Sequence, residues 1–239
     1  MTTFEIKVIA IVTMLIDHIG LAFFFPLSPG YLLFRLIGRL SFPLFAWLIA
    51  NGARHTKNSK KYAVRLFAFA LISQFPFLLF HQQRDPTFFR LNIFFTLCMG
   101  LLIIVLLKRI KGKLVRGFII LAAVIMAEVF QFEYGGTGML VILIFYYFFN
   151  NIRMMFLTLF TLFLIVHIVP AVLEYIQYGI IRADPIWLMQ PLAVVSLLFI
   201  LMYNGKEGIK LKYFFYLFYP FHLFLLYVIK LFLQGGGIQ

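Results

Sequence analysis

The sequence predicts an all-α protein, a polytopic membrane helix bundle of about nine transmembrane helices that forms one domain over residues 1–239. Composition is the first reason, because 64% of the residues are hydrophobic and 12% are charged, against about 45–50% and about 25% in soluble domains. The second reason is that the apolar residues form runs of roughly 20, the length with which a helix crosses a bilayer. The third is that the charge of the loops between these runs alternates. A water-soluble globule and a disordered chain are therefore excluded.

Nine spans follow from the apolar runs and from the short polar, Gly or Pro breaks between them. In chain order they are predicted at residues 5–25, 31–51, 62–80, 90–107, 115–132, 135–151, 154–173, 186–203 and 213–233. The polar or helix-breaking residues at which they end are, in the same order, Pro26, Gly52, His81, Lys108, Glu133, Arg153, Glu174, Asn204 and Gln234. No cluster of basic residues precedes the first span and no cleavage site follows it, so we expect it to be kept rather than removed as a signal peptide.

The loops divide into a strongly basic set and a set of mixed or acidic charge. The basic set holds Arg54, Lys57, Lys60, Lys61 and Arg65, then Lys108, Arg109, Lys111, Lys113 and Arg116, then Arg153, and then Lys206, Lys210 and Lys212. The intervening loops hold Arg84, Asp85 and Arg90, then Glu128 and Glu133, and then Glu174, Arg182 and Asp184. The positive-inside rule places the basic loops and the N-terminus in the cytoplasm. The net charge of +13 is thus a sidedness signal, and we expect the lipid bilayer, not nucleic acid, as the partner.

Several ionisable side chains are predicted near the middle of the membrane, where a charge costs at least about 2.5 kcal/mol. Asp17 and His18 lie about twelve residues into the first span, at about 18 Å of helix length. Arg35 and Arg39 lie four apart on one face of the second span, at a similar depth. His222 in the last span and Ser73 and Gln74 in the third reach the same layer. Four spans therefore bring polar groups to one layer of the membrane.

A buried ion pair that locks the first two spans together explains Asp17 and one arginine, but not two histidines and a second arginine. A lone intramembrane histidine, such as His167, is typical of a hydrogen bond between helices. Lys7 and His18 are eleven residues apart and share one helix face, whereas Asp17 points about 100° away from His18. We therefore expect Asp17 to pair with an arginine and His18 to face a cavity.

This set of residues favours acyl-transfer chemistry. An imidazole titrates near pH 6.5 and can take a proton from an attacking amine or hydroxyl, while a nearby arginine can stabilise the oxyanion. We expect His18, Asp17, Arg39 and His222 to be catalytic, and Arg35, Lys7, Gln74 and Tyr219 to bind substrate. The sequence has no GxSxG, Walker A, HExxH or paired CxxC string, which removes the usual support for a lipase, an ATPase or a zinc protease. No metal site is predicted, and the single cysteine, Cys98, is expected to be a packing residue.

The chain resembles the TraX family of conjugative pilin acetylases over nearly its whole length. The resemblance rests on Met14-Leu15-Ile16-Asp17-His18-Ile19-Gly20, Ile37-Gly38-Arg39-Leu40-Ser41-Phe42-Pro43, Gly52-Ala53-Arg54-His55, Ser73-Gln74-Phe75-Pro76, Leu91-Asn92-Ile93-Phe94, Tyr203-Asn204-Gly205-Lys206 and Tyr219-Pro220-Phe221-His222-Leu223. The family's string at Glu133-Tyr134-Gly135 carries Asp in place of Glu. The wider transmembrane acyltransferase group, which the chain also resembles, includes members with Arg eleven residues before His on the first span; here that position is Lys7.

The resemblance implies a multi-pass protein of the bacterial inner membrane that takes acetyl from cytoplasmic acetyl-CoA. By hypothesis, the anionic nucleotide end of acetyl-CoA binds to the basic loops, and we expect Arg54, Lys57, Asn204 and Lys206 to bind it. Lys60 and Lys61 are further candidates, although topology alone also accounts for any single loop lysine. The loop at Asn204–Gly208 is expected to be flexible enough for its backbone to approach phosphate. The acceptor stays open between a pilin or other peptide amine, a glycan hydroxyl and a lipid. Glu128 and Glu133 fit an amine-bearing acceptor or a solvated acidic loop.

Two functions other than that of an enzyme are also considered. A proton-coupled transporter also uses mid-membrane Asp, His and Arg side chains as a relay. Transporters often show broken helices in paired positions, whereas Pro43, Pro76 and Pro220 are expected to interrupt spans without such pairing. A purely structural subunit would not need so many buried charges.

Overall fold

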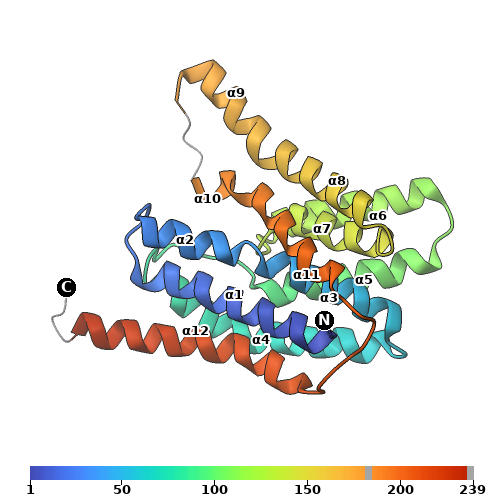
Figure 1. Cartoon of the computed structure of the whole chain (residues 1–239), viewed down its shortest axis with the longest axis horizontal. Coiled ribbons are helices and arrows are strands. Elements are labelled where there is room, and N and C mark those ends of the chain that lie inside the picture. The colour runs from blue at the N-terminus through green and yellow to red at the C-terminus, as the bar shows by residue number, and fades with distance from the viewer. Residues whose placement is uncertain (181–184, 236–239) are drawn as a thin grey trace. The chain divides into compact units, whose positions relative to one another are not determined.

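The computed structural model describes residues 1–180 and 185–235, and Figure 1 traces them as helices joined by short connections. Arg182 and Asp184, predicted for an acidic loop, lie outside the described residues. Within the described ranges the chain forms helices and no strand, apart from an isolated bridge between Leu91 and Phe132. The elements are α1 (Thr3–Phe23), α2 (Pro29–Gly38), α3 (Ser41–His55), α4 (Ser59–Gln82), α5 (Ile93–Arg109), α6 (Lys113–Val129), α7 (Gly135–Tyr147), α8 (Ile152–Phe163), the π-helical η1 (Leu164–Ile168), α9 (Val169–Tyr178), α10 (Pro185–Leu188), the 3₁₀-helical η2 (Gln190–Ser196), α11 (Leu197–Leu201) and α12 (Lys212–Gly235).

The all-α helical bundle is confirmed, and each predicted span coincides with a helix or a run of helices. Five stretches of the described chain are long and apolar enough to cross a membrane: Thr3–Phe23, Pro29–His55, Ser59–Gln82, Ile152–Tyr178 and Lys212–Gln234. The other predicted spans coincide with shorter helices, namely α5, α6, α7 and the run from η2 to α11. The protein is therefore a membrane protein, and the sidedness of its loops stays a prediction.

The second predicted span, 31–51, is broken into α2 and α3 at Arg39 and Leu40. Pro43 explains the break, because proline has no N–H to donate to the carbonyl four residues earlier, which is that of Arg39. The two other prolines expected to interrupt spans do not: α4 continues through Pro76 and α12 through Pro220. The predicted span 154–173 instead changes to a π-helical turn at η1, which ends two residues before Pro170.

The chain divides into two compact units, and each is built from two separate segments of the sequence. The first unit comprises Met1–Phe45 and Phe148–Lys210, and the second comprises Ala46–Tyr147 and Leu211–Gln239. Each unit is described by itself. A single domain stays a prediction, since a division by contacts does not show whether either unit folds alone.

In the first unit, α1 packs along α2, and small residues bring the two helices close together. A β-carbon at Gly20 would lie 2.6 Å from the β-carbon of Phe34, and one at Gly38 would overlap the carboxylate of Asp17. Glycine at both positions therefore lets the backbone of one helix approach the side chains of the other. The long helix formed by α8, η1 and α9 packs against η2 and α11 in the same unit.

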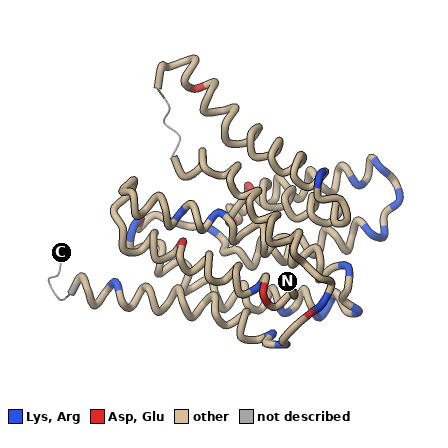
Figure 2. The backbone as a smooth tube through the Cα atoms, in the orientation of Figure 1, with Lys and Arg blue, Asp and Glu red and all other residues tan. Residues whose placement is uncertain are grey.

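In the second unit, α4 packs against α12 and α5, and α7 packs against α5 and α6. Stacked rings join α4 to α12, with the centroids of Phe69 and Tyr216 4.9 Å apart. The basic loops lie together, because the ammonium of Lys108 at the end of α5 donates to the carbonyl of Ala53 near the end of α3 at 2.6 Å. Figure 2 shows the Lys and Arg residues of the α3–α4 and α5–α6 connections at the same end of this unit. This clustering is what the alternating loop charge predicts.

Candidate functional site

The carboxylate of Asp17 on α1 lies between the guanidiniums of two arginines. Arg35 on α2 donates to Oδ2 of Asp17, and Nη2 of Arg39 lies 3.3 Å from Oδ1. The expected pairing of Asp17 with an arginine of the second span is confirmed, and both arginines of that span take part. The side chains of Asp17, Arg35 and Arg39 are 13%, 16% and 8% exposed, so the ion pairs are largely withdrawn from the surface.

Arg39 is held in place by groups on three segments of the first unit. It is the residue that ends α2, and its Nε donates to the carbonyl of Arg35 one turn earlier at 3.2 Å. Its Nη1 donates to Oε1 of Gln190 at the start of η2, at 3.1 Å. Gln190 is 3% exposed, so this hydrogen bond is buried. The fork of Arg39 therefore links α1, through Asp17, to η2.

The cluster carries more positive than negative charge. Two guanidiniums share one carboxylate, which leaves a formal charge of +1 on Asp17, Arg35 and Arg39 together. The Nε–H of Arg35 is buried and has no hydrogen-bond partner among the described residues. A buried donor without an acceptor is costly. The arrangement therefore suits an anionic or strongly polarised group placed beside the arginines.

His18 lies next to Asp17 in sequence but on a different face of α1. It is 6% exposed and continues a buried stripe formed by Ile11 and Met14 at helical spacing. Lys7 occupies the same stripe near the start of the helix and is half-buried. The shared face predicted for Lys7 and His18 thus agrees with the burial pattern, while a cavity beside His18 and the roles of both residues stay predictions.

His222 and Tyr219 belong to α12, in the second unit, and both are buried. Nδ1 of His222 lies 2.8 Å from the carbonyl of Phe218, one turn earlier. If Nδ1 carries the proton and donates to that carbonyl, Nε2 is the nitrogen with a lone pair. The hydroxyl of Tyr219 donates to Oε2 of Glu133 at 3.5 Å, and Thr96 donates to the carbonyl of Glu133 at 2.6 Å.

Gln74 performs a structural task in the second unit. Its Nε2 donates to the carbonyl of Arg90 at 2.7 Å, and its Oε1 accepts from the backbone and side-chain N–H groups of Asn92 at 3.1 and 2.8 Å. Asn92 is fully buried, also donates to the carbonyl of Ala70, and caps the start of α5. The polar groups of Gln74 thus fix the connection from α4 to α5, and its predicted contact with substrate is untested.

Residues predicted to bind the nucleotide are also divided between the units. In the second unit, Arg54 donates to the carbonyl of Tyr146 at 2.8 Å, and its guanidinium lies 5.3 Å from the centroid of that ring. The ammonium of Lys108 lies 5.7 Å from the same ring, so two cations flank one tyrosine. Lys57 is exposed on the α3–α4 connection.

In the first unit, the loop that carries Asn204 and Lys206 is hydrogen-bonded to the start of α1, and the flexibility expected of this loop stays a prediction. The backbone N–H groups of Thr3 and Phe4 donate to the carbonyls of Lys206 and Glu207 at 2.9 and 3.0 Å. These are orphan donors of the first helical turn, so the loop caps α1. Its turns rely on Gly205 and Gly208, whose φ angles of 78° and 74° favour glycine.

The structure therefore brings together Asp17, Arg35 and Arg39, and it adds Gln190, which the sequence did not single out. The four residues predicted to be catalytic are divided, with Asp17, His18 and Arg39 in the first unit and His222 in the second. In the part of the chain that the structure describes, no group of three or more His, Cys, Asp or Glu residues could hold a metal ion.

Comparison with known proteins places this site in a family. Residues 3–230 match the family model described as TraX protein. The chain is 30% identical over 247 residues to a protein of Dichelobacter nodosus described as "Probable fimbrial assembly protein FimC, serogroup H1", with 98% of this chain and 97% of that protein covered. No solved structure matches. Because the family model spans nearly the whole chain, including every residue of the Asp17 cluster, the protein belongs to the TraX family.

Proposed function

We propose that this protein is an acetyltransferase of the bacterial inner membrane, which moves an acetyl group from cytoplasmic acetyl-CoA to an amine or hydroxyl of an acceptor. The observation that carries the proposal is the buried surplus of positive charge at Asp17, Arg35 and Arg39, together with the unused N–H of Arg35. Acyl transfer passes through a tetrahedral intermediate whose oxygen is negative. That oxyanion would lie beside two guanidiniums and would supply an acceptor for the Nε–H of Arg35.

The reaction needs a base as well as an oxyanion site. In the proposed step, His18 takes the proton from the acceptor nitrogen or oxygen as that atom attacks the thioester carbonyl carbon. The carbonyl π electrons move to oxygen, which Arg39 and Arg35 stabilise. When the intermediate collapses, the carbon–sulfur bond breaks, His18 returns the proton to the departing sulfur, and the products are the acetylated acceptor and free CoA.

Asp17 and Gln190 act as positioning residues in this scheme. Asp17 fixes both guanidiniums, and Gln190 fixes the second nitrogen of the Arg39 fork. An oxyanion site works through donors that are already aimed before the charge develops. The bonds to Asp17 and Gln190 fix the orientation of the Arg39 guanidinium. The single, flexible ammonium of a lysine would not be fixed in this way.

The candidates for binding the acceptor are His222 and Tyr219 on α12. His222 and Tyr219 share a face of α12, and Tyr219 bonds to the carboxylate of Glu133. A carboxylate beside a buried tyrosine and histidine suits an amine, which is cationic until it loses a proton. Arg54, Lys57, Asn204 and Lys206 stay the candidates for binding the phosphates of acetyl-CoA.

The name of the Dichelobacter relative points to fimbrial assembly, which favours a pilin or another peptide amine as the acceptor. A glycan hydroxyl or a lipid would use the same chemistry.

The test is transfer of labelled acetyl from acetyl-CoA to a peptide amine by purified full-length protein. We expect His18→Gln to abolish transfer while the protein still folds, because glutamine keeps the hydrogen-bonding capacity but is not a base. His55→Gln is the matched control, since His55 lies at the end of α3 and bonds to the carbonyl of Asn51. Normal transfer by His18→Gln would remove His18 from the mechanism. Failure of the wild type to bind or use acetyl-CoA would favour the proton-coupled transporter.

A further inference from the structure

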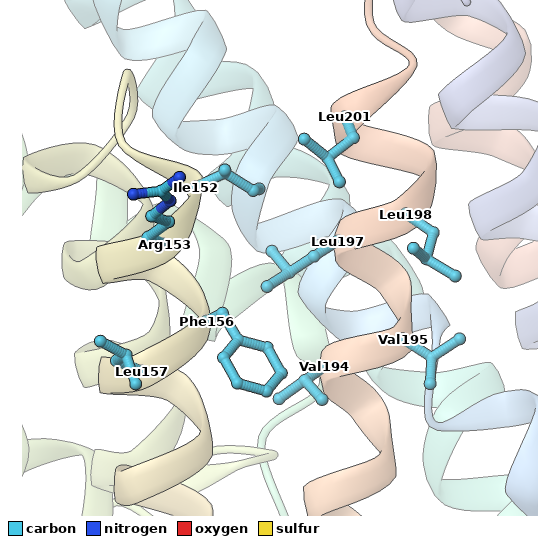
Figure 3. Close-up of a pocket in the computed structure, with 9 residues that line it drawn as sticks. All are labelled: Ile152, Arg153, Phe156, Leu157, Val194, Val195, Leu197, Leu198 and Leu201. Atoms are coloured by element: carbon cyan, nitrogen blue, oxygen red, sulfur yellow. The ribbon is translucent and has the colours of Figure 1, made fainter.

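A groove of about 550 Å³ runs between α8 and the segment formed by η2 and α11 in the first unit. Its lining is apolar apart from one arginine at its end, as Figure 3 shows, and consists of Ile152, Arg153, Phe156, Leu157, Val194, Val195, Leu197, Leu198 and Leu201. A volume of this size falls within the range of small-molecule sites, about 300–1,000 Å³. Leu197 forms part of the buried floor, while Leu157 and Leu198 are more than half exposed at the rim.

The groove lies on a surface that the described part of this chain leaves largely uncovered. The apolar stretch Ile152–Tyr178 is long enough to cross a membrane, yet only 17% of its most apolar window is buried within the protein. Val194 to Leu201 extends over about 12 Å along the helix axis, given rises of about 2.0 Å and 1.5 Å per residue in 3₁₀- and α-helix. One leaflet's hydrocarbon is about 15 Å thick, so the groove matches the length of one acyl chain in one leaflet.

Among the described residues that line the groove, the one charged side chain is that of Arg153, and no described carboxylate neutralises it. Arg153 lies at one end of the groove, beside Ile152 and at the same end as Leu201 (Figure 3). Among the described residues it has no hydrogen-bond or ion-pair partner, and no carboxylate lines the groove. A guanidinium binds a phosphate through two parallel hydrogen bonds. An acyl chain with a phosphate at its polar end is therefore complementary to the groove in shape and in charge.

We propose that this groove binds an anionic glycerophospholipid of the surrounding bilayer, with one acyl chain in the groove and the headgroup phosphate on Arg153. A lipid with net negative charge is favoured over a zwitterionic one, because the groove has no acidic side chain to receive a choline or ethanolamine. The site is separate from the Asp17 cluster, and its occupation does not depend on acetyl transfer.

The experiment is native mass spectrometry of the full-length protein in detergent with equal amounts of palmitoyl-oleoyl phosphatidylglycerol and phosphatidylcholine. One arginine near an anionic headgroup favours binding about fivefold, and we expect that preference for phosphatidylglycerol in the wild type. Arg153→Gln should bring the ratio to about one while total bound lipid changes little. Arg109→Gln, which removes an exposed arginine at the end of α5, is the matched control and should keep the preference.

A second pair of variants tests the groove itself. Leu198→Trp fills it and should lower the binding of both lipids, whereas Leu173→Trp, at an exposed position of α9 outside the lining, should not. Equal binding of the two lipids by the wild type, or an equal loss of preference in Arg109→Gln, would overturn the proposal. So would a protein dimer that carries no lipid and is broken by Leu198→Trp, because the groove would then be an interface between two copies.

Discussion

Replacing Asp17 by asparagine tests whether one carboxylate balances two buried arginines. The change keeps the size of the side chain and one acceptor oxygen, but raises the formal charge of the cluster from +1 to +2. At the 3.3 Å between Nη2 of Arg39 and Oδ1 of Asp17, one such pair is worth about 5 kcal/mol at an effective dielectric constant of about 20. Desolvation offsets part of this, and removing one partner of a buried pair typically costs about 3–5 kcal/mol.

Thermal unfolding of the detergent-solubilised protein measures this cost. In a chain of this length about 1 kcal/mol corresponds to about 2–4 °C, so we expect Asp17→Asn to lower Tm by about 6 °C or more. Asp85→Asn is the control, because Asp85 is exposed on the α4–α5 connection, and it should change stability by less than about 0.5 kcal/mol.

A second variant, Arg35→Gln, distinguishes this explanation from one that only counts ion pairs. Arg35→Gln leaves Asp17 paired one-to-one with Arg39, so the cluster becomes neutral. We expect it to destabilise the protein less than half as much as Asp17→Asn. Equal destabilisation by the two variants would refute the view that the single carboxylate of Asp17 serves both guanidiniums.

Three further substitutions probe the contacts that hold this site and the second unit. Gly38→Ala should destabilise by about 1–3 kcal/mol in thermal unfolding, because the new methyl group would overlap the Asp17 carboxylate. Gln190→Leu should cost about 1–3 kcal/mol, since it leaves Nη1 of Arg39 without its buried acceptor. Asn92→Ala should cost at least about 2 kcal/mol in chemical unfolding, because it removes a helix cap and a buried bond to the carbonyl of Ala70 together.

Each of these has a matched control. Gly117→Ala, in a helical position with open space around it, should stabilise by up to about 1 kcal/mol; the same gain at Gly38 would contradict the close packing of α1 on α2. Gln82→Leu removes an exposed hydrogen bond to Phe88 and should be nearly neutral. Asn58→Ala removes only an exposed cap of α4. If it lowers stability as much as Asn92→Ala does, the burial of Asn92 does not increase the cost of its removal.

The helices were predictable because each apolar run ends at residues that a bilayer rejects or a helix does not tolerate. Pro43 predicted an interruption of the span 31–51, but not that the break would lie at Arg39 and Leu40. Hydropathy averages over the whole run and does not register one missing hydrogen bond. Pro76 and Pro220 show the opposite case, since a proline inside a long helix need not end it. Whether proline breaks a helix depends on packing around the freed carbonyl, which the sequence alone does not give.

The sequence predicted that the charged residues Asp17, Arg35 and Arg39 belong to one site, but it did not predict that the neutral residue Gln190 joins them. Asp17, Arg35 and Arg39 stand out because a charge in the membrane needs a partner, and the spacing of the two arginines places both on one face. Gln190 carries no such signal, because an amide in an apolar run next to a proline resembles any span boundary. Gln74 was expected to bind substrate only because of its predicted depth in the membrane. Its hydrogen bonds to Arg90 and Asn92 in the α4–α5 connection join residues 16 and 18 positions apart, and the sequence pattern does not reveal them.

The most direct test of the central claim is kcat for acetyl transfer from acetyl-CoA to a peptide amine by Arg35→Gln, with unfolding measured on the same sample. If the surplus charge of the Asp17 cluster stabilises the oxyanion, kcat falls by about 10²–10³-fold, while the protein stays more stable than Asp17→Asn. An unchanged kcat in folded Arg35→Gln would contradict the claim.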